Sequence, residues 1–317
     1  MRTLLLSITF TLILWAGPIQ TNYFHPNQWM MYNPIGKDLV ISDTISVGLI
    51  NTSVFETESY YADEYIFDAE ITALLLQGHK TLSKQHRLDF SLPLYAMHGG
   101  IMDGLINEFH HLLNIGTPRD RNNEVYNQFR YLVKDGGTTI IDESGSYSGI
   151  GNFQVDLVSK WLEGSFELGS LVGIKIPLNQ DPVVTTGKID IATGLILHKA
   201  FNDKHHLYSN LLLTYNTPYD LRTTTQNNVV RFFGLLSYNY VKQNKDIFIV
   251  EYKFSSPPFD DGVIEFFYEV SRAMNIGYQF SLGKDNALEI FVLEDDFPYK
   301  NYSDISFAIN YKHTFRR

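Results

Sequence analysis

Hydrophobic and polar side chains alternate along most of the chain after residue 40. The segment Ile305–Phe315 shows the pattern clearly, because Phe307 and Ile309 share one face while Ser306 and Asn310 share the other. A repeat of two is typical of a β-strand, whose successive side chains point to opposite faces of a sheet. About twelve such segments occur, near residues 42–53, 63–77, 86–97, 148–162, 164–177, 187–200, 204–216, 228–241, 245–255, 272–283, 286–294 and 303–315.

The connections between these predicted strands differ in length, and short and long ones follow each other in turn. We count as a sixth short connection the seam where the first and last strands would close the sheet. Bacterial outer-membrane barrels show this asymmetry, with tight periplasmic turns and longer outer loops. The other short connections lie near residues 79–85, 162–165, 201–204, 242–245 and 283–286, and the long ones near 55–63, 98–146, 178–186, 217–227, 256–272 and 294–304.

Together these patterns predict an all-β fold, a transmembrane antiparallel β-barrel of about twelve strands. A secreted β-sandwich is the alternative, since its strands alternate in the same way around a dry core. The barrel is favoured because the segments are long enough to cross a bilayer when tilted and because aromatic residues gather near their ends. A closed sheet also pairs every backbone group without water. We therefore expect apolar faces outside and polar faces inside.

The first residues resemble a targeting segment. A positive Met1-Arg2 pair precedes the uncharged apolar stretch Thr3–Ala16, which is too short to span a membrane comfortably. This order is typical of a secretory signal, although an uncleaved anchor or a buried strand would share the apolar stretch. We predict a signal peptide over residues 1–20 that is cleaved, a single barrel domain over 21–317, and location in the bacterial outer membrane.

Composition narrows the classes of partner. Lys and Arg total 25 and Asp and Glu total 35, which gives a net charge of −10 and argues against nucleic acid as a partner. The chain has no cysteine, so disulfides, thiolate metal sites and a cysteine nucleophile are excluded. Its 20 Tyr and 22 Phe suit strands and membrane interfaces. We expect outer-membrane lipid as a partner, and no cofactor.

The long connection over residues 98–146 contains one predicted helix. Apolar residues recur at helical spacing over 101–115, two glycines precede the stretch, and Gly116 and Pro118 follow it. The helix would fold into the lumen as a plug, held by polar side chains that bond to the barrel wall. The candidate plug or lumen polar cluster consists of Asp103, Asn107, Glu108, His110 and Arg121.

The same region resembles a known family. The stretch GGIMDGLINEFHHLLNIGTPRDR, from Gly99 to Arg121, is similar to the signature of an uncharacterised group of Gram-negative outer-membrane proteins, domain of unknown function 3187. Weaker matches occur over residues 148–157, 172–179, 254–259 and 293–297. The resemblance implies a transmembrane barrel in the outer membrane and implies no activity. The matching positions are Gly99, Gly100, Asp103, Ile106, Phe109, His110, Gly116 and Arg121.

Charged residues recur on the polar faces of the strands, where they would face the lumen. Such charges can line a water-filled channel or pair across a closed interior. An acidic excess would favour cations over anions in an open channel. The candidate lumen-facing charges are Asp156, Lys160, Lys175, Arg231 and Glu251, whereas the adjacent His205 and His206 are expected in a solvated turn.

No catalytic or metal-binding motif is found in the sequence. HExxH and GxSxG are absent, and Glu108 with His111 would supply only two ligands. We therefore predict no catalytic or metal site, and a pore or transport channel for small solutes with the helix as an internal constriction. An outer-membrane lipid-modifying enzyme and a structural or adhesive barrel are the alternatives. The C-terminal strand Ile305–Phe315 resembles the signal read by the barrel-assembly machinery, although Arg316-Arg317 follow its terminal aromatic residue.

Overall fold

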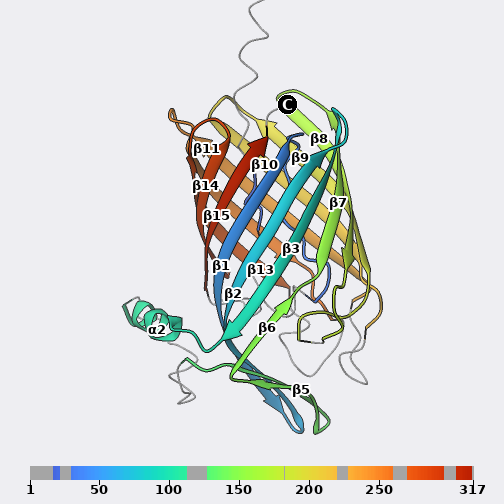
Figure 1. The fold of residues 1–317 in the computed structure, drawn as a ribbon, viewed down its shortest axis with the longest axis vertical. Helices are drawn as coiled ribbons and strands as arrows, with labels where there is room; N and C mark the ends of the chain where they lie inside the picture. The colour runs from blue at the N-terminus through green and yellow to red at the C-terminus, as the bar shows by residue number, and fades with distance from the viewer. Residues whose placement is uncertain are drawn as a thin grey trace, which may run out of the picture.

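A computed structural model describes residues 17–21, 30–112, 127–181, 183–219, 228–259, 270–295 and 305–315. Within these ranges fifteen strands form one antiparallel sheet (Figure 1). Twelve of the strands build the barrel: β1 (Asp43–Tyr60), β2 (Asp63–Thr81), β3 (His86–His98), β7 (Phe153–Leu162), β8 (Phe166–Ile176), β9 (Asp190–Ala200), β10 (His205–Tyr215), β11 (Val230–Val241), β12 (Ile247–Ser255), β13 (Ser271–Ser281), β14 (Asn286–Asp295) and β15 (Ile305–Phe315).

The sheet closes on itself because β1 pairs with both β2 and β15. Asp43 lies opposite Phe315 and Ser53 lies opposite Ile305, so the seam runs along the whole of β15. Strand β3 is followed in the barrel by β7, since the chain between them leaves the wall. The twelve predicted strands and the closed antiparallel barrel are therefore confirmed.

The exterior of the barrel is apolar, whereas its interior combines polar, charged and apolar side chains. On β1, Ile45 is 49% exposed and Leu49 is 50% exposed, while the intervening Ser46 is 4% exposed. A water-soluble sandwich would bury the apolar positions and expose the polar ones. The opposite distribution is that of a barrel whose outer face meets lipid. The same outward exposure recurs at Leu74, Phe90, Val172, Leu195, Leu213, Leu236, Ile276, Ile290, Phe307 and Ile309.

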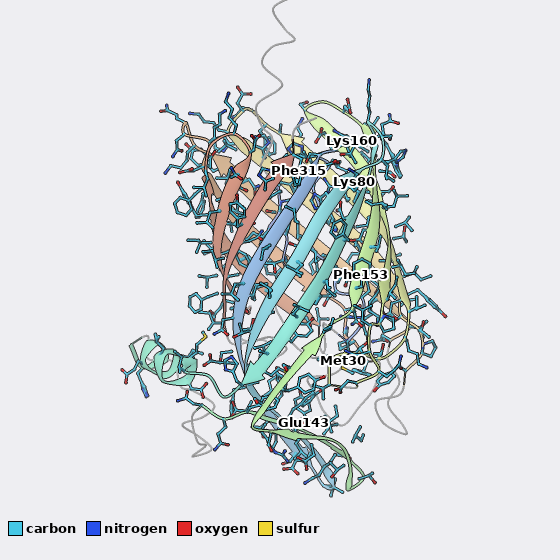
Figure 2. All side chains as sticks on the ribbon, viewed as in Figure 1. Met30, Lys80, Glu143, Phe153, Lys160 and Phe315 are labelled. Carbon is cyan, nitrogen blue, oxygen red and sulfur yellow. The ribbon has the colours of Figure 1, made fainter. Side chains whose placement is uncertain are left out.

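The two ends of the barrel differ. The short turns over residues 82–85, 163–165, 201–204, 242–246 and 282–285 lie at one end, which also holds the start of β1 and the end of β15. We call this the turn end and the opposite one the loop end. Lys80, Lys160 and Phe315 mark the turn end in Figure 2, and Met30 and Glu143 lie toward the loop end. The predicted short connections and the seam are confirmed.

The predicted loop over residues 55–63 is wrong, because β1 and β2 stay paired there up to a turn at Tyr61-Ala62. The two strands continue beyond the barrel and are joined by β4 (Arg130–Asp135) and β5 (Thr138–Ser144). Together they form an extension at the loop end (Figure 1). Its stability comes from aromatic packing, since the rings of Tyr65 and Phe67 meet the Tyr131 ring edge-on at centroid distances of 6.3 and 4.8 Å.

Helix α2 (Met102–Leu112) occupies most of the predicted stretch, and residues 113–115 lie outside the described ones. Figure 1 shows it beside the loop end, outside the barrel wall. Ile101, just before it, is 83% exposed and Leu105 is 74% exposed. The predicted internal helical constriction is therefore not confirmed. No helix in the described part of the chain is long and apolar enough to cross a membrane.

Candidate functional site

The lumen of the barrel is occupied by the chain that precedes β1. Residues 30–40, which we call the inner segment, form no helix or strand, and all of them except Asn33 and Val40 are buried. Buried backbone groups need hydrogen-bond partners, and a segment without secondary structure cannot supply its own. The inward side chains of the wall supply them instead. Residues 17–21 contact the wall in the same way.

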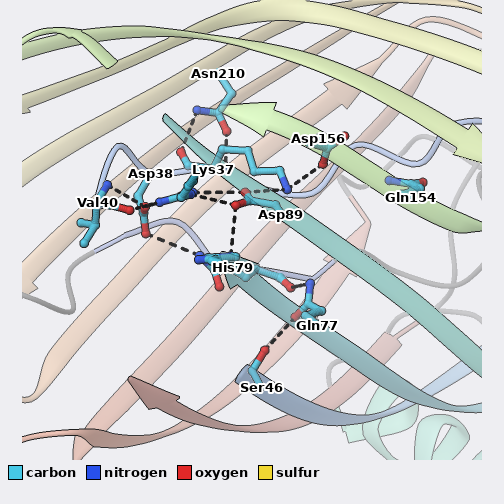
Figure 3. Close-up of polar contacts among 12 residues, drawn as sticks. Lys37, Asp38, Val40, Ser46, Gln77, His79, Asp89, Gln154, Asp156 and Asn210 are labelled. Atoms are coloured by element: carbon cyan, nitrogen blue, oxygen red, sulfur yellow. Dashed lines mark hydrogen bonds and ion pairs between the residues drawn. The ribbon is translucent and has the colours of Figure 1, made fainter. Parts of the chain in front are cut away.

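A buried ion-pair cluster holds the middle of the inner segment. The Nζ atom of Lys37 lies 2.8 Å from Oδ2 of Asp156 on β7 and 3.1 Å from Oδ2 of Asp89 on β3 (Figure 3). All three side chains are less than a tenth exposed. Two carboxylates buried this deeply need a compensating cation, and Lys37 provides it.

The next residue forms the complementary contact. Oδ1 of Asp38 lies 2.5 Å from Nη1 of Arg87 on β3, and Nε of Arg87 donates to Oδ1 of Asp89 at 2.8 Å. Arg87 is fully buried and also donates to the carbonyl of Val40. Lys37 and Asp38 therefore each meet wall charges of the opposite sign. The inner segment is thus fixed by two adjacent residues of opposite charge.

Tyr32 anchors the end of the inner segment nearer the loop end. Its hydroxyl donates to Oδ1 of Asp156 at 2.5 Å, and its backbone N–H donates to Oδ2 of Asp190 at 3.0 Å. Asp190 is itself paired with Lys175, whose Nζ lies 2.8 Å away. One buried network therefore connects Tyr32 and Lys37 through Asp156.

The wall also offers apolar side chains to the inner segment. Tyr32 and Leu39 of the inner segment pack against a buried hydrophobic cluster contributed by five consecutive barrel strands, β7 to β11. Because Asp156, Lys175 and Asp190 lie on three of the same strands, charged and apolar side chains are neighbours on this part of the wall, and the inner segment offers matching residues to both. The wall members of this cluster are Val158, Leu171, Ala192, Ile196, Leu212, Phe233 and Leu235.

The five lumen charges predicted from the sequence all lie on inward positions. Asp156 and Lys175 contact the inner segment, the latter through a bond from Nζ to the carbonyl of Met30. Glu251 accepts a hydrogen bond from the N–H of Ile19 at 3.0 Å. Arg231 donates to the carbonyl of Ser256 and, through Nη1, to Sδ of Met31 in the inner segment at 3.8 Å. Lys160 lies apart, 3.4 Å from Glu167 at the turn end.

Of the five residues of the predicted plug cluster, the structure describes the side chains of Asp103 and Glu108. Asp103 is buried at the start of α2, where its Oδ2 accepts a hydrogen bond from the N–H of Asn127 at 2.5 Å. Glu108 is exposed on the helix. Asn107 and His110 also lie on α2, but their side chains are not among the described ones, and Arg121 lies outside the described residues.

Sequence reasoning missed the inner segment and misplaced one histidine. Lys37-Asp38 is the only adjacent pair of opposite charges within residues 30–40. This pair was the one feature of the sequence that could have indicated a segment bound by charges of the wall. His206, expected in a solvated turn, is 1% exposed. Its Nδ1 lies 3.0 Å from Nε2 of His198, whose Nδ1 lies 2.7 Å from Glu167. Among the described residues, no three His, Asp or Glu side chains are arranged to hold a metal ion.

Comparisons with known proteins agree with this architecture. A family model described as a protein of unknown function (DUF3187) matches residues 24–315. The COG4313 outer membrane channel from Pseudomonas putida F1 is 12% identical, with a TM-score of 0.57 over 88% of this chain and 97% of that one. The NanC porin is 7% identical, with a TM-score of 0.50 over 86% of this chain and 100% of the porin. No curated protein is significantly similar. The structural likeness shows the barrel fold.

Proposed function

The chain belongs to the DUF3187 family, and we propose that it is an outer-membrane channel for small solutes whose closed state is maintained by the inner segment. The observation that carries this proposal is the contrast between the two faces of the wall. The outer face is apolar, whereas the inner face carries charged and amide side chains whose partners lie on a segment with no secondary structure. A wall of this kind can be hydrated once the segment leaves.

The proposed location follows from the outer face and the two ends. An apolar exterior around a closed sheet is suited to lipid, because no backbone group is left unpaired. Tight turns face the periplasm in bacterial barrels, so the turn end would be periplasmic and the loop end external. Export would use the signal segment, cleaved in a Gram-negative cell. The barrel-assembly machinery would engage β15, which forms the seam with β1.

In this proposal the inner segment constricts the lumen, a role that the sequence analysis had assigned to the helix. Once the segment has left, this part of the wall keeps three carboxylates, Asp89, Asp156 and Glu289, against two cations, Arg87 and Lys312, an acidic excess of one charge. We therefore propose a cation preference for the open channel. The helix α2 lies outside the wall and takes no part in closing it.

Planar-bilayer recordings test the proposal. The intact protein is expected to conduct rarely, and a variant lacking residues 30–40 is expected to conduct steadily, because the deletion removes the segment from the lumen and leaves every barrel strand complete. The matched control lacks residues 102–112 instead and should behave like the intact protein. Equal currents from the intact protein and the variant lacking residues 30–40 would contradict the proposal. The heat-modifiable mobility of each protein on a gel checks that the barrel has formed.

A further inference from the structure

The wall binds the inner segment through its main chain as well as its side chains. The carboxamide of Asn210 on β10 accepts a hydrogen bond from the N–H of Lys37 at 2.7 Å and donates to the carbonyl of the same residue at 3.0 Å (Figure 3). Asn210 is fully buried. A carboxamide has an acceptor oxygen and two donor hydrogens, so it can pair with the N–H and the carbonyl of one residue, as a residue of a neighbouring antiparallel β-strand would.

Gln154 on β7 repeats this arrangement four residues earlier. Its Oε1 accepts from the N–H of Asn33 at 2.8 Å, and its Nε2 donates to the carbonyl of Asn33 at 3.0 Å. The two carboxamides project from separate strands into the lumen. They therefore hold two residues of one segment, each through both its main-chain N–H and its main-chain carbonyl.

A buried ion pair serves the peptide groups at the start of the segment. Nζ of Lys175 donates to the carbonyl of Met30 at 2.8 Å, and Oδ2 of Asp190 accepts from the N–H of Tyr32 at 3.0 Å. Lys175 and Asp190 also pair with each other at 2.8 Å. The pair thus offers one donor and one acceptor to the main chain while staying neutral as a unit.

Residues 17–21 are bound by the same principle elsewhere in the lumen. Glu251 accepts from the N–H of Ile19 at 3.0 Å, and Lys253 and Gln77 donate to the carbonyls of Thr21 and Gln20 at 2.6 and 2.8 Å. Asn239 donates to the carbonyl of Gly17 at 2.7 Å. Main-chain recognition therefore extends through the lumen of the uncleaved chain, and removal of the predicted signal peptide over residues 1–20 would leave the wall partners of Gly17, Ile19 and Gln20 open to another peptide.

From this geometry we infer that the lumen wall is a binding site for extended peptides, and that short peptides are the class of solute the channel takes. The inference rests on the proposed channel function. Main-chain contacts are independent of side-chain identity, so a wall that makes them can accept many sequences. The paired charges and the apolar cluster would then accommodate acidic, basic and apolar side chains of the passing peptide. The inner segment occupies this path as a resident peptide.

Peptide block of single channels tests the inference. The variant lacking residues 30–40 is recorded in a planar bilayer with the synthetic peptide MMYNPIGKDLV, with a neutral alanine-rich peptide of equal length, or with a neutral oligosaccharide of similar mass. Both peptides are expected to interrupt the current for much longer than the oligosaccharide. Because four hydrogen bonds are lost, adding Asn210→Leu and Gln154→Leu should shorten the peptide residence time by about tenfold or more.

Each outcome decides one claim. Interruptions by the oligosaccharide as long as those by the peptides would overturn the peptide inference, and so would residence times that the double substitution leaves unchanged. Absence of current from the deletion variant, in a protein that still shows the heat-modifiable mobility of a folded barrel, would overturn the channel function itself and the peptide inference with it. Current without peptide block overturns the peptide inference alone.

Discussion

Lys37, in a segment without secondary structure, and Asp156, on strand β7, form an ion pair of 2.8 Å in which both side chains are buried. The ion pair connects the inner segment, which precedes β1 in the chain, to the inner face of the barrel wall. Asp89 lies on the other side of the same ammonium group at 3.1 Å and also pairs with Arg87, so two wall carboxylates share two cations, of which Lys37 belongs to the inner segment. The position of the inner segment is therefore expected to depend strongly on this single residue.

Lys37→Met should release the inner segment. The substitution leaves Asp156 without its cation, whereas Asp89 keeps Arg87, and loss of one partner from a buried ion pair costs about 3–5 kcal/mol. We expect the open probability in planar bilayers to rise toward that of the variant lacking residues 30–40. Lys80→Met is the control, because Lys80 forms a pair of similar length with Asp43 but is 62% exposed, and exposed pairs contribute little. Equal effects of the two substitutions would contradict the docking role of Lys37.

The open channel should select weakly for cations, and Asp156 should carry part of that preference. In the variant lacking residues 30–40, Asp156→Asn removes the local acidic excess beside Asp89 and Arg87. The reversal potential in a salt gradient should then shift toward anions. Glu108→Gln, an exposed position on the outer helix, serves as the control and should leave it unchanged. A reversal potential insensitive to Asp156→Asn would show that this level of the lumen does not govern selectivity.

Glu70 fixes α2 to the outer side of the barrel wall. Its Oε1 accepts hydrogen bonds from the N–H groups of Ile101 and Met102, at the positive end of the helix dipole. Glu70→Gln should weaken this attachment by about 1 kcal/mol. Hydrogen exchange over residues 102–112 should become faster by roughly fivefold, a change that the same free energy implies. The bilayer current should not change, and a changed current would mean that α2 takes part in closing the lumen.

The outer face should reject charge at the depth of the membrane. Val47 is 42% exposed on the apolar face of β1, and an arginine near the bilayer midplane of such a barrel costs about 2–4 kcal/mol. Val47→Arg should lower the yield of folded protein in lipid vesicles, measured by heat-modifiable mobility. Tyr61→Arg at the tip of the extension, where the side chain is 94% exposed, should fold normally. Equal yields would argue against a lipid-facing β1.

The strands could be predicted from the sequence because their signal is local. Alternation over Ile305–Phe315 or 272–283 follows from the geometry of a single strand, and the lumen charges Asp156 and Lys175 then fall on the face opposite the apolar one. The extension was not predicted, because the turn at Tyr61-Ala62 lies beyond the barrel. The ring of Tyr131, which packs against Tyr65 in the extension, comes from a strand distant in the sequence.

The segment that fills the lumen has no comparable local pattern in the sequence. The inner segment has no periodicity, and its hydrogen bonds go to wall residues such as Gln154 and Asn210, which are more than a hundred positions away. The helix could be predicted from its 3.6-residue repeat, but an apolar stripe does not specify what covers it. Its position outside the wall depends on a contact with Glu70 on β2, 31 positions before Ile101, which the repeat within the helix does not indicate.

Thiol accessibility in the lipid-embedded protein tests the central claim most directly. The chain has no cysteine, so Leu39→Cys introduces a single thiol at a position that is 1% exposed inside the barrel. A membrane-impermeant maleimide should label it far more slowly than Tyr61→Cys on the extension, and adding Lys37→Met should speed the labelling. Labelling of Leu39→Cys as fast as Tyr61→Cys would contradict an inner segment that occupies the lumen.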